Sequence, residues 1–146
     1  MEALIRFFEE SIRFNAHMGV RVDELTEGFA RLRLPFREEF LGDPFRPALH
    51  GGVTSFLADV CGGLAVFTKI MPDGRCSTVD LRVDYLHPGA RAELIAEARV
   101  VRMGNRVAVT NIEIRQGDEL IAEARAVYNL VIKKVDHQGG GPDGLE

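Results

Sequence analysis

The chain has 146 residues with a net charge of −4, and 46% of them are hydrophobic and 27% charged. That length suits a single domain with one core, and the composition is typical of a soluble globular protein rather than a basic nucleic-acid binder. Only two cysteines occur, Cys61 and Cys76, without metal-ligand spacing, so we expect no disulfide framework, no metal site and a cytoplasmic location.

The first residues predict a short amphipathic helix that ends near Asn15. Leu4, Phe7, Phe8 and Ile12 recur at helical spacing, with charged residues between them. The segment lacks the apolar stretch and cleavage site of a signal peptide. Its polar face is not enriched in lysine or arginine, so we expect it to cover a core rather than to lie on a membrane.

Two strand-like segments follow, at 20–25 and 28–35, and they predict either one bent strand or a hairpin about residues 26–28. In the second segment the apolar residues Ala30, Leu32 and Leu34 alternate with arginines, which is the period of a strand with one wet face. Residues 36–47 contain a glycine and two prolines and predict a loop.

An apolar stretch at 48–68 predicts a long helix from Gly51 to Ile70. Asp59 is the only formally charged side chain between Arg46 and Lys69. The stretch is long enough to span a membrane, but the central aspartate and the neighbouring Gly62-Gly63 pair disfavour a span. We therefore expect a buried core helix and no membrane partner.

After a turn at 72–74, four strand-like runs lie at 77–86, 92–102, 106–115 and 119–133. The joints between them are short, which predicts consecutive antiparallel neighbours. The expected fold is α+β, with an antiparallel sheet wrapped around the long helix and an N-terminal helix beside it. Residues 1–134 form one predicted domain, and the glycine-rich residues 135–146 form a predicted disordered tail.

Asp59 and the start of the long helix are the candidate chemical groups. A carboxylate among apolar residues is neutralised, hydrogen-bonded or used in a cleft. The unpaired amides after His50, at Gly51 and Gly52, can attract an oxyanion at the helix N-terminus, and acyl chemistry needs both features. Two simpler interpretations stay open: a structural role for Asp59, and a purely steric need for the two glycines.

Three motifs in this order resemble those of the hot-dog fold acyl-CoA thioesterases, and are most similar to the PaaI-like branch. They are LHGGVTSFLAD at 49–59, STVDLRVDYLHPG at 77–89 and VRMGNRVAVT at 101–110. The resemblance covers the chain from about Phe14 to Lys133. It implies a dimer, commonly a dimer of dimers, whose sheets join edge to edge and whose active sites lie between subunits.

The resemblance also implies roles for particular residues. The amide of Gly51, with Gly52 beside it, polarises the thioester carbonyl, while Asp59 of the partner subunit activates water or attacks directly. Thr78, or alternatively Ser77, orients the nucleophile. The basic loop from Arg102 to Arg106 meets the phosphates of coenzyme A, which is part of the substrate, so no separate cofactor is expected.

His50 and Asp43, near the start of the long helix, are harder to assign to a role. His50 is expected to orient or cap the helix rather than to act as a base, because a lone histidine before a helix more often has that role. No second histidine or cysteine is spaced to bind a metal with it. Many relatives have asparagine or glutamine at the position of Pro44 in this chain. Asp43 precedes it, so Gly42-Asp43-Pro44 resembles the Gly-Asn-Pro sequence of a related subgroup, with aspartate in place of asparagine. An ionised aspartate cannot donate a hydrogen bond to substrate.

Three functions therefore stay open: hydrolysis of acyl-CoA, binding of acyl-CoA without catalysis on the same fold, and dehydration of hydroxyacyl thioesters. The departure at Asp43 favours the second. Dehydration would need a histidine and a carboxylate at one substrate carbon. The phenylalanines at 40, 45, 56 and 67 are consistent with an apolar acyl pocket, and equally with core packing.

Overall fold

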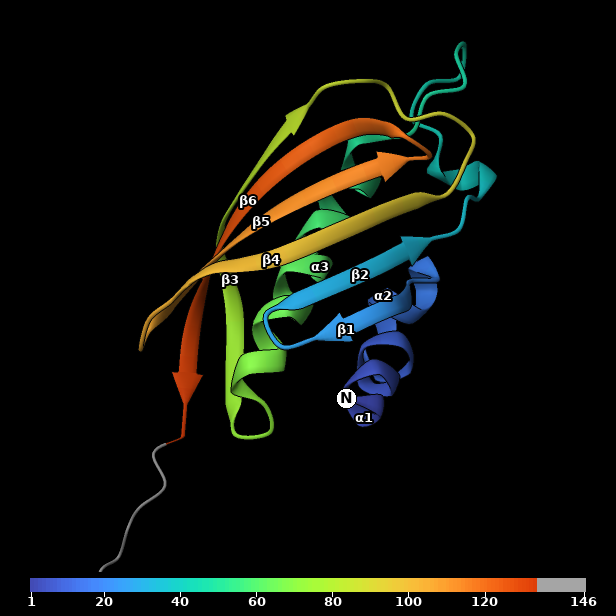
Figure 1. Cartoon of the computed structure of the whole chain (residues 1–146). Helices are drawn as coiled ribbons and strands as arrows, with labels where there is room; N and C mark the ends of the chain where they lie inside the picture. Colours follow the sequence, from blue (N-terminus) through green and yellow to red (C-terminus); the bar gives the residue numbers. More distant parts are fainter. Residues whose placement is uncertain (134–146) are drawn as a thin grey trace, which may run out of the picture.

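One antiparallel sheet of six strands curves around helix α3 (Gly51–Ile70), as Figure 1 shows for the computed structural model, which describes residues 1–133. This confirms the expected α+β architecture, and the predicted bounds of the long helix are confirmed. The predicted tail at 135–146 lies outside the described residues. The strands are β1 (Arg21–Thr26), β2 (Phe29–Leu34), β3 (Gly74–Tyr85), β4 (Leu94–Met103), β5 (Val107–Gln116) and β6 (Glu119–Ile132).

The order of the strands corrects one prediction. It is β1-β2-β4-β5-β6-β3, so only β4, β5 and β6 form a meander. Strand β3 pairs with β6, and the connection through residues 86–93 crosses to the other side of the sheet, where β4 pairs with β2. The expectation that β3 and β4 are neighbours was wrong, because a short joint permits a hairpin but the burial of each strand's apolar face decides the pairing.

The N-terminal segment is helical but is not one regular helix. It contains α1 (Glu2–Arg6), a π-helical turn η1 (Phe7–Ser11) and α2 (Arg13–Met18), with an extended residue at Ile12. The bend lets two aromatic side chains pack on α3 at separate places. The Phe8 and Phe67 ring centroids lie 5.4 Å apart, and those of Phe14 and Phe56 lie 5.0 Å apart.

A hairpin joins β1 and β2, which decides between the two alternatives left open by the sequence. Thr26 pairs with Phe29, and Gly28 adopts a φ of 74°, a left-handed conformation that favours glycine. The Gly28 amide donates to the Thr68 hydroxyl of α3 at 2.8 Å, so the hairpin is tied to the end of the central helix.

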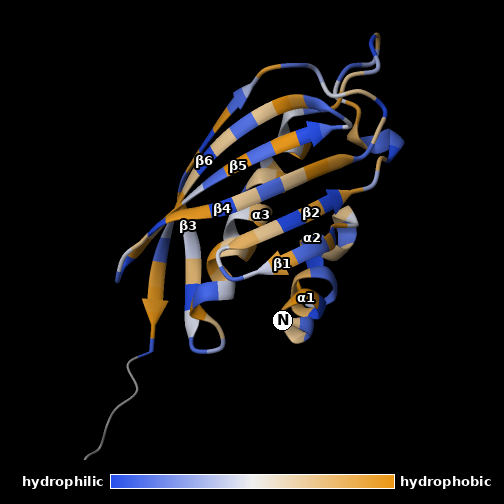
Figure 2. Cartoon of the chain, viewed as in Figure 1, coloured by the Kyte–Doolittle hydropathy of each residue, from blue (hydrophilic) through white to orange (hydrophobic). Residues whose placement is uncertain are grey.

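The core lies between α3 and the concave face of the sheet. Figure 2 shows the alternation of polar and apolar residues along the strands in front of a mostly apolar α3. Leu57 and Leu64 of α3 and Leu32 of β2 are completely buried. Each fully buried leucine side chain stabilises the fold by roughly 1.5–3 kcal/mol relative to an exposed one.

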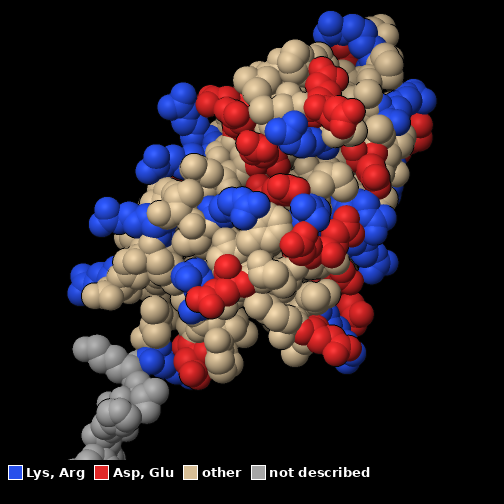
Figure 3. Space-filling model, viewed as in Figure 1, with Lys and Arg blue, Asp and Glu red and all other residues tan. Residues whose placement is uncertain are grey.

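The convex face of the sheet carries interspersed positive and negative side chains (Figure 3). Ion pairs join neighbouring strands there, including Arg31 Nε to Glu97 Oε1 at 2.8 Å and Arg33 to Asp23 at 3.2 Å. Such exposed pairs contribute little to stability, about 0–1 kcal/mol each. This face therefore behaves as a solvated surface over most of β1, β2 and β4.

Helix α3 is long and apolar enough to cross a membrane by composition alone. In the fold most of it is buried, because β2, β3, β4 and β5 cover one side and the N-terminal aromatic residues pack on another. Its apolar character is accounted for by the core of this fold.

Candidate active site

The start of α3 leaves one backbone amide free. His50 is the N-cap residue, and its Nδ1 atom accepts a hydrogen bond from the Gly52 amide at 2.8 Å. The Val53 amide donates to the His50 carbonyl at 3.0 Å. Among residues 1–133 no acceptor bonds to the Gly51 amide. The donor at the positive end of the helix is therefore Gly51, whereas Gly52 is already occupied by His50.

Two loops hold this helix start in place. The His50 amide donates to the Phe40 carbonyl at 2.8 Å, and the Leu49 amide donates to the Gly89 carbonyl at 2.9 Å. A Cβ at Gly42 would lie 2.7 Å from the His50 Cα, so the loop approaches the helix start as closely as glycine allows. Two loops that are far apart in the sequence thus fix the direction of the Gly51 amide.

Tyr85 borders the same place and was missed by the sequence analysis. Its hydroxyl donates to the Gly51 carbonyl at 2.8 Å, and its side chain, 55% exposed, lies at the end of β3. A hollow of about 300 Å³ opens between Gly51, Thr54, Tyr85 and the loop that follows β3. The only sequence signal was an aromatic residue at the end of an alternating strand, which is common in any sheet.

Asp59 and Thr78 meet at the open edge of the sheet. The Thr78 hydroxyl donates to Asp59 Oδ1 at 2.7 Å, and Asp59 is only partly buried. A β-bulge follows at once, between Thr78 and Asp80, where the register of β3 against β6 shifts by one residue. Bulges of this kind often occur next to active sites, where they change the direction of a side chain. The structure thus brings together two residues that the sequence analysis had selected separately.

Ser77 points to the other face of the sheet. It pairs with Asn129, whereas Thr78 pairs with the buried Tyr128, and successive residues of a strand face opposite sides. Of the two alternatives for a hydroxyl beside Asp59, the geometry favours Thr78.

The two cysteines have no chemical role in this arrangement. Cys61 is completely buried, its thiol donates to the carbonyls of Ala30 and Ala96, and burial raises its pKa. Burial, with a smaller effect from the Asp59 carboxylate, raises the pKa of Cys76 to about 12. Neither thiol is therefore a nucleophile near neutral pH.

Gly51 and Asp59 do not converge within one chain. They are eight residues apart on the same helix, which places them about 12 Å apart along its axis at 1.5 Å per residue. A thioester carbonyl held by the Gly51 amide is thus out of reach of a water held by Asp59 of the same chain.

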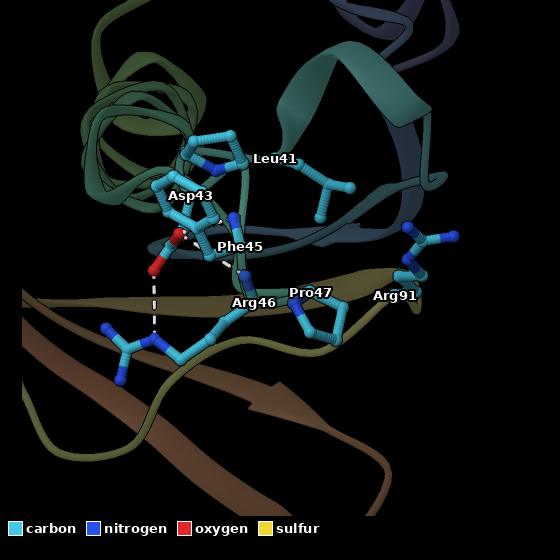
Figure 4. Close-up of a pocket in the computed structure, with 8 residues that line it drawn as sticks. Leu41, Asp43, Phe45, Arg46, Pro47 and Arg91 are labelled. Atoms are coloured by element: carbon cyan, nitrogen blue, oxygen red, sulfur yellow. Dashed lines mark hydrogen bonds and ion pairs between the residues drawn. The ribbon is translucent and has the colours of Figure 1, made fainter.

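Asp43 organises its own loop. Its Oδ1 accepts from the Phe45 amide at 2.8 Å and its Oδ2 pairs with Arg46 Nε at 2.9 Å, as the dashed lines in Figure 4 show. These bonds, that of the Phe45 amide first, lower the pKa of Asp43. The hollow of about 530 Å³ drawn there is lined by Leu41, Pro47, Arg91 and the loop itself. The predicted substrate contact thus has its oxygen atoms already engaged.

Arg102 and Arg106 flank the hairpin between β4 and β5, at the end of the sheet far from the start of α3 (Figure 1). Both are exposed, and within residues 1–133 neither pairs with a carboxylate. The Leu130 amide donates to the Arg106 carbonyl at 2.7 Å, and Leu130 pairs with Cys76. The hairpin therefore lies at the Thr78 end of the sheet, not at the Gly51 end.

No group of three or more histidine, cysteine, aspartate or glutamate side chains within the described part of the chain is arranged to hold a metal ion. The expectation of a reaction without a metal site stays a prediction.

Comparison with known proteins decides the family. The model of the thioesterase superfamily matches residues 47–127, a segment that includes Gly51, Asp59 and Thr78. The chain belongs to the thioesterase superfamily. The resemblance to hot-dog fold thioesterases is thereby confirmed. Relatives that are named acyl-CoA thioesterases also confirm the expectation of a thioester hydrolase.

Individual relatives agree with this membership. The chain is 35% identical to the medium/long-chain acyl-CoA thioesterase YigI of Salmonella typhimurium, over 79% of this chain and 83% of that protein. A Shewanella oneidensis protein related to the thioesterase superfamily superimposes with a TM-score of 0.80 at 26% identity, covering 88% of this chain and 93% of the other. A Silicibacter pomeroyi thioesterase family protein, 24% identical, shares the fold with a TM-score of 0.82, over 90% and 98% of the two chains.

Proposed function

We propose that this thioesterase-superfamily protein hydrolyses thioesters of coenzyme A with apolar, medium to long acyl chains. The observation that carries the proposal is the hydrogen bond from Thr78 to Asp59 Oδ1, which leaves the second carboxylate oxygen without a hydrogen-bond partner among the described residues. The name of the Salmonella relative supports acyl-CoA as the substrate class. Membership of the PaaI-like branch and a cytoplasmic location are further parts of this proposal.

In the proposed reaction the Gly51 amide donates a hydrogen bond to the thioester carbonyl oxygen. Asp59 removes a proton from a water molecule, and the water oxygen bonds to the carbonyl carbon. The negative charge that develops on the carbonyl oxygen is stabilised by the amide at the helix start. The C–S bond then breaks, the sulfur takes the proton, and the products are a free acid and coenzyme A.

The proposal requires two chains, since Gly51 and Asp59 of one chain are about 12 Å apart along α3. Strand β3 supports this, because one edge is paired with β6 and the other, within residues 1–133, is unpaired. Val79 and Tyr85 on β3 are 64% and 55% exposed, and an open edge with apolar side chains favours pairing with another strand. Two chains joined at β3 would place the Gly51 of one beside the Asp59 of the other.

The nucleotide end of the substrate is proposed to meet Arg102 and Arg106. Both guanidinium groups are exposed and lack carboxylate partners within the described residues, so they are available to phosphate oxygens. Their position at the Thr78 end of the sheet is compatible with a substrate whose carbonyl lies between Asp59 and the partner's helix start.

A panel of acyl-CoA substrates with a thiol-trapping reagent tests the proposal. The panel contains short, medium, long and aromatic acyl groups and compares the wild type with Asp59→Asn. We expect thiol release by the wild type with medium or long chains, and loss of release in the variant. A rise in Tm on adding acyl-CoA without thiol release would instead indicate a binding protein, and addition of water to an enoyl-CoA would indicate a dehydratase.

A further inference from the structure

Helix α3 carries no side chain at Gly62, in the turn after Asp59, and this leaves a gap on the helix surface. A Cβ at Gly62 would overlap the Tyr128 hydroxyl and would lie 2.7 Å from Thr110 Oγ1. Glycine in a helix interior costs about 1 kcal/mol relative to alanine, so a residue that keeps this space open needs a reason. The space is filled by Tyr128 of β6, which is 2% exposed.

The Tyr128 hydroxyl reaches through this gap to the main chain of Asp59. It donates a hydrogen bond to the Asp59 carbonyl oxygen at 2.8 Å. Burial, and secondarily the charge of Asp59, hold the pKa of Tyr128 above its usual value. The hydroxyl therefore stays protonated and remains a donor near neutral pH.

Tyr128 and Thr78 form a directly opposed pair across β6 and β3. Their two hydroxyl groups reach Asp59 at different atoms, since Thr78 bonds the carboxylate at 2.7 Å and Tyr128 bonds the carbonyl at 2.8 Å. One cross-strand pair thus holds both the side chain and the backbone of the same residue. The bulge that follows Thr78 interrupts the regular ladder immediately beyond this pair.

We propose that Tyr128 is a positioning residue for Asp59: together with Thr78 it fixes the carboxylate relative to the open edge of the sheet, and Gly62 is the space that admits it. The proposal rests on the proposed function, in which Asp59 activates water. Tyr128 does not contact the reacting atoms. It fixes the position of α3 along and about the helix axis, so that Asp59 Oδ1 lies within hydrogen-bond distance of the Thr78 hydroxyl.

The test compares Tyr128→Phe, which removes the hydroxyl and keeps the ring, with Thr110→Val. Thr110 is completely buried beside the same gap, where its hydroxyl lies next to that of Tyr128 but makes no hydrogen bond to Asp59. For Tyr128→Phe we expect a fall in kcat of about tenfold with KM for acyl-CoA within about twofold, because positioning affects the reaction more than binding. Thr110→Val should leave kcat unchanged.

A double variant separates positioning from a purely structural role. If Thr78 and Tyr128 both act through Asp59, Thr78→Val combined with Tyr128→Phe lowers kcat little further than the larger single effect. Multiplied effects on kcat, or a lower Tm with unchanged kcat in Tyr128→Phe, overturn the proposal.

The two proposals fail separately. If the wild type hydrolyses acyl-CoA and Tyr128→Phe keeps the full kcat, only the positioning role is lost. If the wild type hydrolyses no thioester, the proposed function fails, and the crystal structure of Tyr128→Phe decides the positioning role. An unchanged 2.7 Å bond from Thr78 to Asp59 in that crystal structure overturns it, and a rotated Asp59 side chain supports it.

Discussion

The Thr78 hydroxyl lies 2.7 Å from Asp59 Oδ1 and joins the edge strand β3 to the middle of the central helix α3. This one hydrogen bond orients the only carboxylate of α3 toward the open side of the sheet.

Replacing Asp59 with asparagine removes the proposed base and keeps an oxygen that can accept from Thr78. We expect kcat for acyl-CoA hydrolysis to fall by about a hundredfold or more, since general-base catalysis contributes 10²–10⁴. Thermal unfolding should be nearly unchanged. Asp73→Asn, in the exposed turn before β3, is the matched control with the same charge change and should keep full activity. Equal kcat in both variants would remove Asp59 from the mechanism.

Gly51→Pro removes the free amide without removing the helix start. Proline is favoured at the first helical position, and His50 already has the extended conformation (φ −62°, ψ 130°) that a residue before proline prefers. We expect kcat to fall by about a hundredfold, the usual effect of losing one oxyanion donor. Circular dichroism checks that the helix is retained. A variant with normal helix content and normal kcat would assign carbonyl polarisation to another group.

Mixing these two inactive variants tests whether one site uses two chains. In a mixed dimer of Gly51→Pro with Asp59→Asn, one of the two sites combines an intact Gly51 with an intact Asp59. We therefore expect activity to return when the two proteins are unfolded together and refolded, to about a quarter of the wild-type value for random pairing. Absence of recovery, with mixed dimers confirmed by mass spectrometry, would place both groups of each site in one chain.

Gly62 and Gly63 offer a matched pair for stability. A Cβ at Gly63 would lie 3.6 Å from Tyr128 Cε1, an ordinary contact, whereas one at Gly62 would overlap the Tyr128 hydroxyl. Gly63→Ala should increase the free energy of unfolding by up to about 1 kcal/mol through helix propensity. Gly62→Ala should decrease it by about 1 to 2 kcal/mol, because overpacking outweighs that gain. Urea unfolding measures both, and equal effects would contradict the close approach of Tyr128.

Asp43 should make the stability of the protein depend on pH, through the hydrogen bonds that it accepts within loop 42–47. Hydrogen bonds from the Phe45 amide and Arg46 lower its pKa below the ordinary value of 3.8. A lowered pKa in the folded state means that the stabilisation is present above the ordinary pKa and is lost as the pH falls through the folded value. Compared with Asp43→Ala, the wild type should thus be more stable at pH 7, and the difference in Tm should shrink below pH 4. A difference in Tm that does not change as the pH falls would show that the carboxylate charge is not the cause.

The sequence by itself determined the elements and one chemical group. The spacing of apolar residues predicted α3 from Gly51 to Ile70 and most of the strands, because local periodicity reflects which side of each element is buried. The isolation of Asp59 was visible without a structure, since a charge stands out in an apolar stretch. The His50-Gly51-Gly52 start was equally visible as the first turn of a helix.

Only the tertiary structure decided which residues meet. The pairing of β3 with β6 depends on contacts between segments far apart in the chain, and joint lengths alone had suggested β4 instead. That pairing leaves β3 at the edge, sets Thr78 against Asp59 and passes Tyr128 through the gap at Gly62. Tyr85 and Tyr128 could not be selected from the sequence, because a hydrogen bond to a distant backbone carbonyl produces no periodic pattern along the chain.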